Sequence, residues 1–258
     1  MTDDAKPRTS VQSMNSVLST LRVLEEVAIR QPIGVSELAR ATRIPKSTVQ
    51  RCLVTLQQAG WLRIVDPDLS RWGVTMKVLA IGLRGAGKQD LQVLAAPVLK
   101  RLAAETDETV HLALRDGHDC IIVGREDTTQ IIRVFLELGT RLPLRATSAG
   151  VAIMACLESE EIDEILGDEP TEYDDLSPAE LRQEIERTAE RGYSVNMSAW
   201  YRPHVSSIGA VIKDSSKQPV AALALSIPQM RFDPAREDAL ARLTVAAADE
   251  ITTLISAC

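Results

Sequence analysis

The chain has 258 residues, 45% of them hydrophobic, and a formal net charge of −7. This length is enough for two hydrophobic cores, one small and one of ordinary domain size. No apolar run approaches the roughly 18 residues that span a membrane, and Asp3 and Asp4 stand where a secretory signal would be basic and then apolar. We therefore expect a cytoplasmic protein without a membrane partner.

Charge is divided unequally along the chain. Residues 1–89 hold 13 Lys and Arg against 7 Asp and Glu, a balance of +6, whereas residues 90–258 hold 16 against 29, a balance of −13. A basic small part joined to an acidic larger one favours phosphate binding confined to the N-terminal end, with chance asymmetry as the alternative.

The cysteines and histidines predict no metal site. There is no C-x-x-C pair, and His111, His118 and His204 are not closely spaced, as zinc ligands would be. We expect buried free thiols, no metal and no cofactor. The cysteines are Cys52, Cys120, Cys156 and Cys258.

The N-terminal part begins with a polar arm and an apolar helix. Residues 1–12 are expected to be mobile. The apolar side chains that follow recur at helical spacing, which predicts an amphipathic helix packed beneath the next two helices. Its stripe consists of Met14, Val17, Leu18, Leu21, Leu24 and Ala28.

Residues 34–60 predict two short helices joined by a tight turn. Ser36 is expected to cap the first helix, and Pro45 suits the first position of the second, which Gly60 ends. One face of the second helix is apolar, because its members recur at i, i+3, i+4 and i+7. They are Val49, Cys52, Leu53 and Leu56.

The outer face of this second helix is short, polar and basic, which suits the major groove of DNA. Strand-like runs over 61–65 and 72–74 follow it, and this order of elements is that of a winged helix. The alternative is an ordinary helical hairpin with a solvated face. We predict that the helix enters the groove and that the wing contacts the flanking backbone. The predicted DNA-binding residues are Ser36, Lys46, Ser47, Thr48, Gln50, Arg51, Arg63 and Arg71.

A further apolar helix is predicted over 76–83, with Thr75 as its cap. In a monomer its apolar face would be exposed. It either forms a dimer contact, which would present two recognition helices to successive turns of a palindromic operator, or packs on its own second domain.

The remainder of the chain alternates strand and helix patterns joined by tight hairpins, which predicts an α+β domain with an antiparallel sheet and flanking helices. Strands are expected over 109–114, 120–124, 131–135, 205–212 and 219–226, and helices over 91–105, 147–157, 158–166, 178–191 and 234–257. The domains are then an arm (1–12), a winged helix-turn-helix (13–75), a linker helix (76–89) and an effector-binding and oligomerisation domain (90–258).

The helix start at Thr147, Ser148, Ala149 and Gly150 is a candidate anion site, because free backbone N–H groups and the positive end of the helix dipole gather there. A simple helix cap is the alternative. Trp200 and Tyr201 are candidates for an apolar wall, or for ordinary core. Three arginines are possible counter-ions, although surface salt bridges explain such residues more often. They are Arg133, Arg141 and Arg145.

Three segments make the sequence resemble the IclR family of bacterial transcriptional regulators along nearly its whole length: ARATRIPKSTVQRCLVTLQQAGWL, GTRLPLRATSAGVAIMACL, and RGYSVN with the later PVAALALSIP. The resemblance implies control of catabolic genes, by repression or activation, in response to small, often carboxylate, metabolites. It also implies a homodimer or a dimer of dimers. By the same resemblance Ser207, Ala224 and Ser226 belong to the effector pocket.

Three positions depart from the family pattern. Arg43 stands where glycine is common in the turn, at a cost of about 1 kcal/mol if that residue is left-handed. Val151 replaces a frequent lysine, and residues 197–202 replace a frequently acidic segment. The rim of the pocket is therefore expected to differ from that of relatives.

Two other functions compete with an effector-controlled regulator. In one, the second domain only mediates oligomerisation and binds no small molecule. In the other it is an enzyme that uses Cys120 or Cys156 with His111 or His118, but no local signature pairs a thiolate with a base. We expect no catalytic residues.

Overall fold

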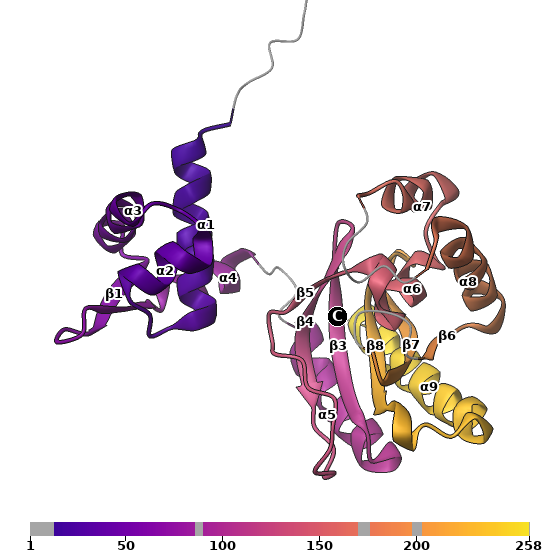
Figure 1. Ribbon diagram of the computed structural model, residues 1–258. Coiled ribbons are helices and arrows are strands. Elements are labelled where there is room, and N and C mark those ends of the chain that lie inside the picture. The colour runs from indigo at the N-terminus through magenta and orange to yellow at the C-terminus, as the bar shows by residue number, and fades with distance from the viewer. Residues whose placement is uncertain (1–12, 86–89, 170–175, 198–202, 258) are drawn as a thin grey trace, which may run out of the picture. The chain divides into compact units, whose positions relative to one another are not determined.

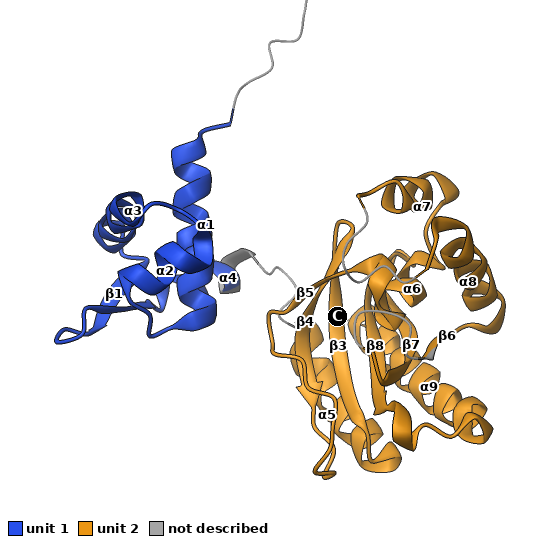
Figure 2. Cartoon of the chain, in the orientation of Figure 1, with its two compact units in different colours: residues 1–87 blue, residues 88–258 orange. Residues whose placement is uncertain are grey.

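The computed structural model describes residues 13–85, 90–169, 176–197 and 203–257. The chain divides into two compact units, residues 1–87 and 88–258 (Figure 2). Within the described ranges, none of the helices is both long and apolar enough to cross a membrane. The same residues contain no cluster of three or more His, Cys, Asp or Glu side chains placed to hold a metal ion.

Unit 1 is a winged helix-turn-helix, as the sequence predicts. Its core is formed where three helices meet, around the fully buried side chains of Leu38, Val49 and Leu53, and an antiparallel hairpin adds Leu62 and Trp72. The elements, shown in Figure 1, are α1 (Asn15–Arg30), α2 (Val35–Thr42), α3 (Lys46–Gln58), β1 (Leu62–Asp66), β2 (Arg71–Val74) and α4 (Lys77–Gly85).

The stripe predicted on α1 packs only in part, so that prediction is wrong for its first half. The core contact comes from Val23 and Val27, which are both fully buried. Each lies one position before a residue of the predicted stripe. Helical spacing identifies an apolar face without showing which part of it the chain covers. Four residues of the predicted stripe are 46–67% exposed. They are Met14, Val17, Leu18 and Leu21.

Unit 2 is an α+β domain built on a six-stranded antiparallel sheet with the order β5-β4-β3-β8-β7-β6, which confirms the predicted fold class. Two helices, α5 and α9, pack on one face, and α6, α7 and α8 cover the other (Figure 1). The strands are β3 (Thr109–Asp116), β4 (Asp119–Glu126), β5 (Arg141–Pro143), β6 (Ser194–Met197), β7 (Val205–Lys213) and β8 (Pro219–Pro228). The helices are α5 (Asp90–Thr106), α6 (Ser148–Met154), α7 (Ser159–Leu166), α8 (Pro178–Arg191) and α9 (Glu237–Ser256), with short 3₁₀ turns at Leu144–Ala146, Gln229–Arg231 and Pro234–Arg236.

Strand alternation separates two hydrophobic cores in unit 2. In β8, Leu223 and Leu225 join the core beneath α5 and α9, whereas Ala222 and Ala224 join the core beneath α6. Successive side chains of a strand point to opposite faces, so both faces of this central strand are buried.

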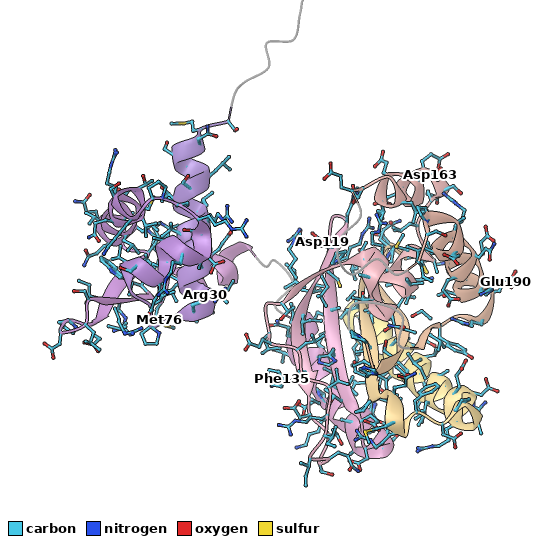
Figure 3. All side chains as sticks on the ribbon, viewed as in Figure 1. Arg30, Met76, Asp119, Phe135, Asp163 and Glu190 are labelled. Carbon is cyan, nitrogen blue, oxygen red and sulfur yellow. The ribbon has the colours of Figure 1, made fainter. Side chains whose placement is uncertain are left out.

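The strand predicted over 131–135 does not form. Its apolar residues do not pair with a neighbouring strand, and guanidinium groups bind the carbonyl of Ile132 within it and that of Leu136 just after it. Arg231 donates to Ile132 O at 2.6 Å, and Arg125 donates to Leu136 O at 2.7 Å. As a result Ile131 is 94% exposed, and Phe135, labelled in Figure 3, is 41% exposed. Sequence reasoning also missed β6.

Candidate functional site

The outer face of α3 carries the polar side chains predicted to meet DNA. Lys46, Ser47, Gln50 and Arg51 are exposed, and Thr48 is half-buried. Within the part of the chain that the structure describes, the Lys46, Gln50 and Arg51 side chains have no hydrogen-bond or ion-pair partner. Since the opposite face is buried, with no member more than 6% exposed, this polar face is fixed in direction and available to a ligand.

The turn between α2 and α3 adopts the shape that glycine commonly provides. Arg43 has φ 56° and ψ 26°, in the left-handed region, and ends α2. The following N–H, of Ile44, donates to Thr42 Oγ1 at 3.3 Å. The helix-turn-helix geometry is therefore kept with an exposed arginine, at the cost of about 1 kcal/mol expected for a left-handed residue with a side chain.

Ser36 does not cap α2; that prediction is wrong. The N-cap residue is Gly34, whose N–H donates to the carboxylate of Glu37 at 3.2 Å, while Ser36 is exposed on the first turn. The carboxylate of Glu37 also forms an ion pair with Arg71 of the wing, with Arg71 Nη1 3.2 Å from Glu37 Oε2. The Gly34 hydrogen bond and then the Arg71 charge lower the pKa of Glu37.

The two wing arginines differ in exposure and in the contacts they make. Arg63 is exposed on β1. Arg71 is half-buried and, besides its ion pair with Glu37, donates to Pro32 O at 3.0 Å. Arg71 thus ties the wing to the start of α2, a role that the sequence did not indicate.

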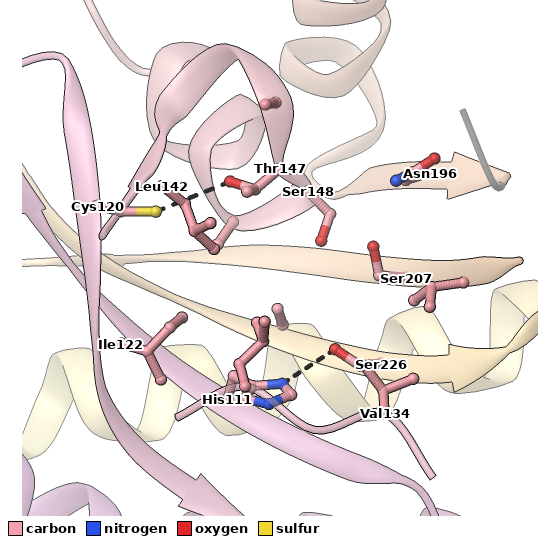
Figure 4. A pocket seen from close by; sticks show the side chains of 15 residues that line it. His111, Cys120, Ile122, Val134, Leu142, Thr147, Ser148, Asn196, Ser207 and Ser226 are labelled. Carbon is pink, nitrogen blue, oxygen red and sulfur yellow. Dashed lines mark hydrogen bonds between the residues drawn. The ribbon is translucent and has the colours of Figure 1, made fainter. Parts of the chain in front are cut away.

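A pocket of about 60 Å³ lies in unit 2 between the sheet and the start of α6 (Figure 4). Its walls are largely apolar, with polar side chains at a few points. Six of the predicted effector residues line it: Thr147, Ser148, Ala149, Ser207, Ala224 and Ser226. The other described lining residues are His111, Cys120, Ile122, Val134, Leu136, Leu142, Ala146, Asn196 and Val205.

Gly150 and Trp200 are the remaining predicted effector residues. Gly150 packs behind the pocket, where a Cβ would overlap the backbone of Leu144. Trp200 lies outside the described residues, as does Tyr201. The helix expected over 147–157 ends at Met154 and has only seven residues, so its dipole is a weaker anion attractor than predicted.

The start of α6 is fixed by its own cap and by the strands below it. Thr147 Oγ1 accepts the Gly150 N–H at 2.9 Å, and Ser194 of β6 donates its hydroxyl to Ser148 O at 2.6 Å. Gly209 of β7 has no side chain, and a Cβ there would overlap that same Ser148 carbonyl. The pocket thus exists because a glycine on β7 lets the helix start approach the sheet.

A row of polar side chains crosses the pocket face of the sheet. Asn196 pairs with Ser207, Ser207 with Ser226, and Ser226 with Thr109, across β6, β7, β8 and β3. All four are buried, none more than 7% exposed. Paired residues of adjacent strands point to the same face, so the row forms a continuous hydrogen-bonding surface. We call it the polar row.

His111 lies beside the polar row and was not predicted to bind an effector. Its side chain is fully buried, and its Nδ1 is 3.0 Å from Ser226 Oγ (Figure 4). The sequence could place His111 on the same strand face as Thr109. It could not show that β3 pairs with β8, because a pairing between strands more than a hundred residues apart leaves no local pattern.

The thiol of Cys120 is not set up for nucleophilic chemistry. Burial raises its pKa to about 11, so the unreactive thiol form dominates near neutral pH. Its Sγ lies 3.8 Å from Thr147 Oγ1, and the imidazole of His111 is hydrogen-bonded to Ser226 instead. His118 is exposed, with Nδ1 2.8 Å from Asp168.

The three arginines considered as counter-ions do not line the pocket. Arg141 pairs with Asp116 and Asp119, and these hydrogen bonds raise its pKa further. Arg133 lies 3.9 Å from Asp127. Arg145 is buried and donates to the backbone oxygen of Asp168 at 3.0 Å. Structural pairing is therefore the better explanation of these residues.

Comparison with known proteins gives matches over both units. Residues 7–65 match the family described as "IclR helix-turn-helix domain", and residues 84–253 match "Bacterial transcriptional regulator IclR C-terminal". The acetate operon repressor of Salmonella typhimurium is 30% identical over 246 residues, which cover 93% of this chain and 89% of that protein. The regulator KipR of Bacillus subtilis is 30% identical over 242 residues, covering 91% and 93%.

A solved structure shares the fold. The chain of an IclR homologue from Microbacterium hydrocarbonoxydans, crystallised in complex with 4-hydroxybenzoate, is 21% identical, with a TM-score of 0.78. The alignment covers 95% of this chain and all of that one. The relatives named here are regulators of transcription, which agrees with the expectation that the chain is not an enzyme.

Proposed function

Since this chain belongs to the IclR family of bacterial transcriptional regulators, we propose that unit 1 binds an operator in double-stranded DNA and represses a catabolic operon. A small carboxylate in the unit 2 pocket controls this binding. The observation that carries the proposal is the exposed polar face of α3, which a buried apolar face fixes within a winged helix. Such binding would take place in the cytoplasm.

On the DNA side, the outer face of α3 enters the major groove. Arg51 and Gln50 read base edges, because their side chains can make paired hydrogen bonds to guanine and adenine. Phosphates are bound at the start of the helix by Lys46, Ser47 and Thr48. Ser36 on α2 also binds a phosphate. Arg63 contacts the backbone beside the groove.

On the effector side, the pocket receives one small acid. Ser148, Ser207, Ser226 and Asn196 provide hydroxyl and amide groups that can donate to a carboxylate, within otherwise apolar walls. The 4-hydroxybenzoate bound by the Microbacterium homologue supports an acid of this general kind. The relative named as the acetate operon repressor supports control of metabolic genes.

The assembly we propose is a homodimer, or a dimer of dimers, on a palindromic operator. The first half of α1 and the helix α4 both expose apolar side chains, including Met76 at 74% and Leu79 at 50% (Met76 is labelled in Figure 3). Pairing of such surfaces around a two-fold axis presents two copies of α3 to the DNA.

Selection of the full chain against a randomised duplex pool at near-physiological salt tests the proposal. We expect enrichment of a two-fold symmetric motif. An Arg187→Ala variant, which removes an exposed charge from unit 2 at its weak 3.7 Å ion pair, controls for total charge and should select the same motif. Retention of DNA without enrichment of any sequence would contradict the proposal.

The effector is tested separately by thermal unfolding in the presence of small carboxylates. A ligand that binds only the folded chain raises the midpoint, and the stabilisation grows with the logarithm of its concentration over Kd. A rise with at least one acid, and none with the matching amide, is the expected result. The absence of any rise would favour a unit 2 that serves oligomerisation alone.

A further inference from the structure

The pocket holds almost no charge of its own. Among the described residues that line it there is no Lys, Arg, Asp or Glu, and the ionisable side chains are His111 and Cys120. The raised pKa of Cys120 keeps that thiol neutral. An ionised carboxylate that leaves water for such a site needs a compensating positive charge or a full set of donors. His111 is the lining side chain that can supply the charge.

His111 is placed to act through Ser226. Its Nδ1 lies 3.0 Å from Ser226 Oγ, and Ser226 stands in the polar row beside Ser207. When Nδ1 carries a proton it donates to Ser226 Oγ. The serine then keeps its own proton free, so its hydroxyl can donate into the pocket. Any form with a proton on Nδ1 therefore makes Ser226 a donor towards an anion, and the form with protons on both ring nitrogens adds a positive charge.

The charged groups on the neighbouring elements do not replace this role. Arg125 of β4 pairs with His111 in the register, but its guanidinium lies over the Phe135 ring and is held by Asp127 at 3.0 Å and by Leu136 O. On the other side, β8 presents Ala224 opposite His111. The start of α6 and strand β6 contribute neutral residues to the lining.

Glu108 and Arg231 stand near the beginning of β3, where they pair with each other at 2.6 Å. Asp107 before them accepts hydrogen bonds from Thr128 and Gln130, which lower its pKa. These acids and bases are thus paired within the fold, and among the described lining residues a carboxylate would meet neutral groups apart from His111.

We propose that His111 is the counter-ion of the acidic effector. Its imidazole takes up one proton from solvent when the acid binds, and it acts on the ligand through the hydrogen bond to Ser226, whose hydroxyl donates to the carboxylate. This rests on the proposed control of the regulator by a carboxylate. The ligand class it specifies is a small monocarboxylate. One imidazolium matches one negative charge, so dicarboxylates and amines would leave a buried charge uncompensated.

The pH dependence of affinity has a definite sign. An opposite charge nearby favours the protonated imidazole, so the complex holds the proton more tightly than the free protein does. Affinity is then greatest at low pH and falls as the imidazole loses its proton with rising pH. The fall is up to about tenfold per pH unit for one linked proton.

Titration calorimetry on the full chain between pH 5.5 and 8.5 tests this, with acetate, propanoate, lactate, benzoate and 4-hydroxybenzoate as probes. These acids are ionised throughout, since carboxylic acids titrate near about pH 4. For the probe that binds best, the heat measured in two buffers of different ionisation enthalpy should report uptake of close to one proton. Near about pH 7, where malonate carries two charges and benzamide none, both should bind at least tenfold more weakly.

His111→Asn is the informative variant, because its amide nitrogen stands about where Nδ1 stands and cannot gain a charge. We expect it to bind the probe as weakly at low pH as the natural chain does at high pH, without a pH slope. His118→Asn, which changes an exposed histidine paired with Asp168, should keep the slope. Proton uptake is measured on the natural chain. The inference can therefore still be tested if His111→Asn does not fold.

A probe that binds with no proton uptake, or with an unchanged slope in His111→Asn, would overturn this inference and leave the proposed regulator intact. If no acid binds at any pH while the chain still selects an operator, the carboxylate effector is wrong, and His111 has no such role.

Discussion

The DNA-facing surface of α3 and the polar row of unit 2 use similar side chains in opposite environments. Ser47, Gln50 and Arg51 are exposed, and water satisfies them until DNA arrives. Ser207 and Asn196 are buried, so folding itself removes their polar groups from water. Substitution on α3 should therefore change binding alone, whereas substitution in the pocket should change binding and stability together.

The largest expected effect is at the floor of the pocket. Gly209→Val should destabilise unit 2 by about 3 kcal/mol or more, because its side chain would overlap Ser148 O and push the start of α6 from the sheet. Thermal unfolding should show a lower midpoint and no response to an acid. Gly82→Ala, in open space on α4, is the matched control and should not lower the midpoint. Equal midpoints for Gly209→Val and the natural chain would show that the helix start is not held as described.

Arg51→Ala tests the other side of the comparison. It should reduce the preference for operator over random duplex by about 1–3 kcal/mol, since a paired contact to a guanine edge is lost. Stability should change by less than about 0.5 kcal/mol, because the side chain is exposed. Binding to both duplexes is measured at several salt concentrations. Equal losses on the two duplexes would refute a base-reading role for Arg51.

Wing contacts should give a smaller effect without sequence preference. Arg63→Ala should weaken all duplexes alike and reduce the salt dependence of binding by about one phosphate contact. Arg71→Ala should do the same, and it should also loosen the wing because Arg71 holds Glu37 and Pro32 O. Proteolysis of the β1–β2 hairpin should therefore be faster in Arg71→Ala only. A hairpin equally resistant in both variants would count against the anchor.

The smallest expected effect concerns Glu37. Its pKa is lowered in the folded state, chiefly by the Gly34 N–H and then by Arg71, so the stability it adds is present above its ordinary pKa of 4.5 and is lost as pH falls through the folded value. Glu37→Gln should lower the unfolding midpoint of unit 1 slightly at pH 7. The gap should close at low pH, and a gap independent of pH would rule out the carboxylate charge as its source.

Sequence reasoning recovered the parts of the molecule that depend on local pattern. The buried face of α3 follows from the spacing of Val49, Leu53 and Leu56, and Gly192 ends α8 as expected, with φ 83°. The predicted cap of α2 was wrong because both a serine and a glycine stand near the helix start. The glycine is the N-cap, and a glutamate accepts its N–H. Gly34 and Glu37 are three residues apart, so this cap is a local pattern, whereas the ion pair with Arg71, 34 residues beyond Glu37, is not.

The pocket was recovered in part for the same reason. Thr147 and Ser148 stand at a helix start that the sequence marks. His111 and Asn196 reach the pocket through strand pairings that no local pattern fixes. The segment over 131–135 is rich in apolar and β-branched residues, but a strand also needs an edge to pair with, and here arginines bind the carbonyls of Ile132 and Leu136.

The alternation of β7 and β8 has a consequence for how such a sensor changes its chemical preference. Ser207 and Ser226 face the pocket, while their sequence neighbours Ile208 and Leu225 face the opposite core. Recognition and scaffold are thus interleaved along the same strands yet separated by the thickness of the sheet. Substitutions at every second position of these strands, in evolution or in a combinatorial library, can therefore change the ligand that binds. The helices on the far side of the sheet keep their contacts.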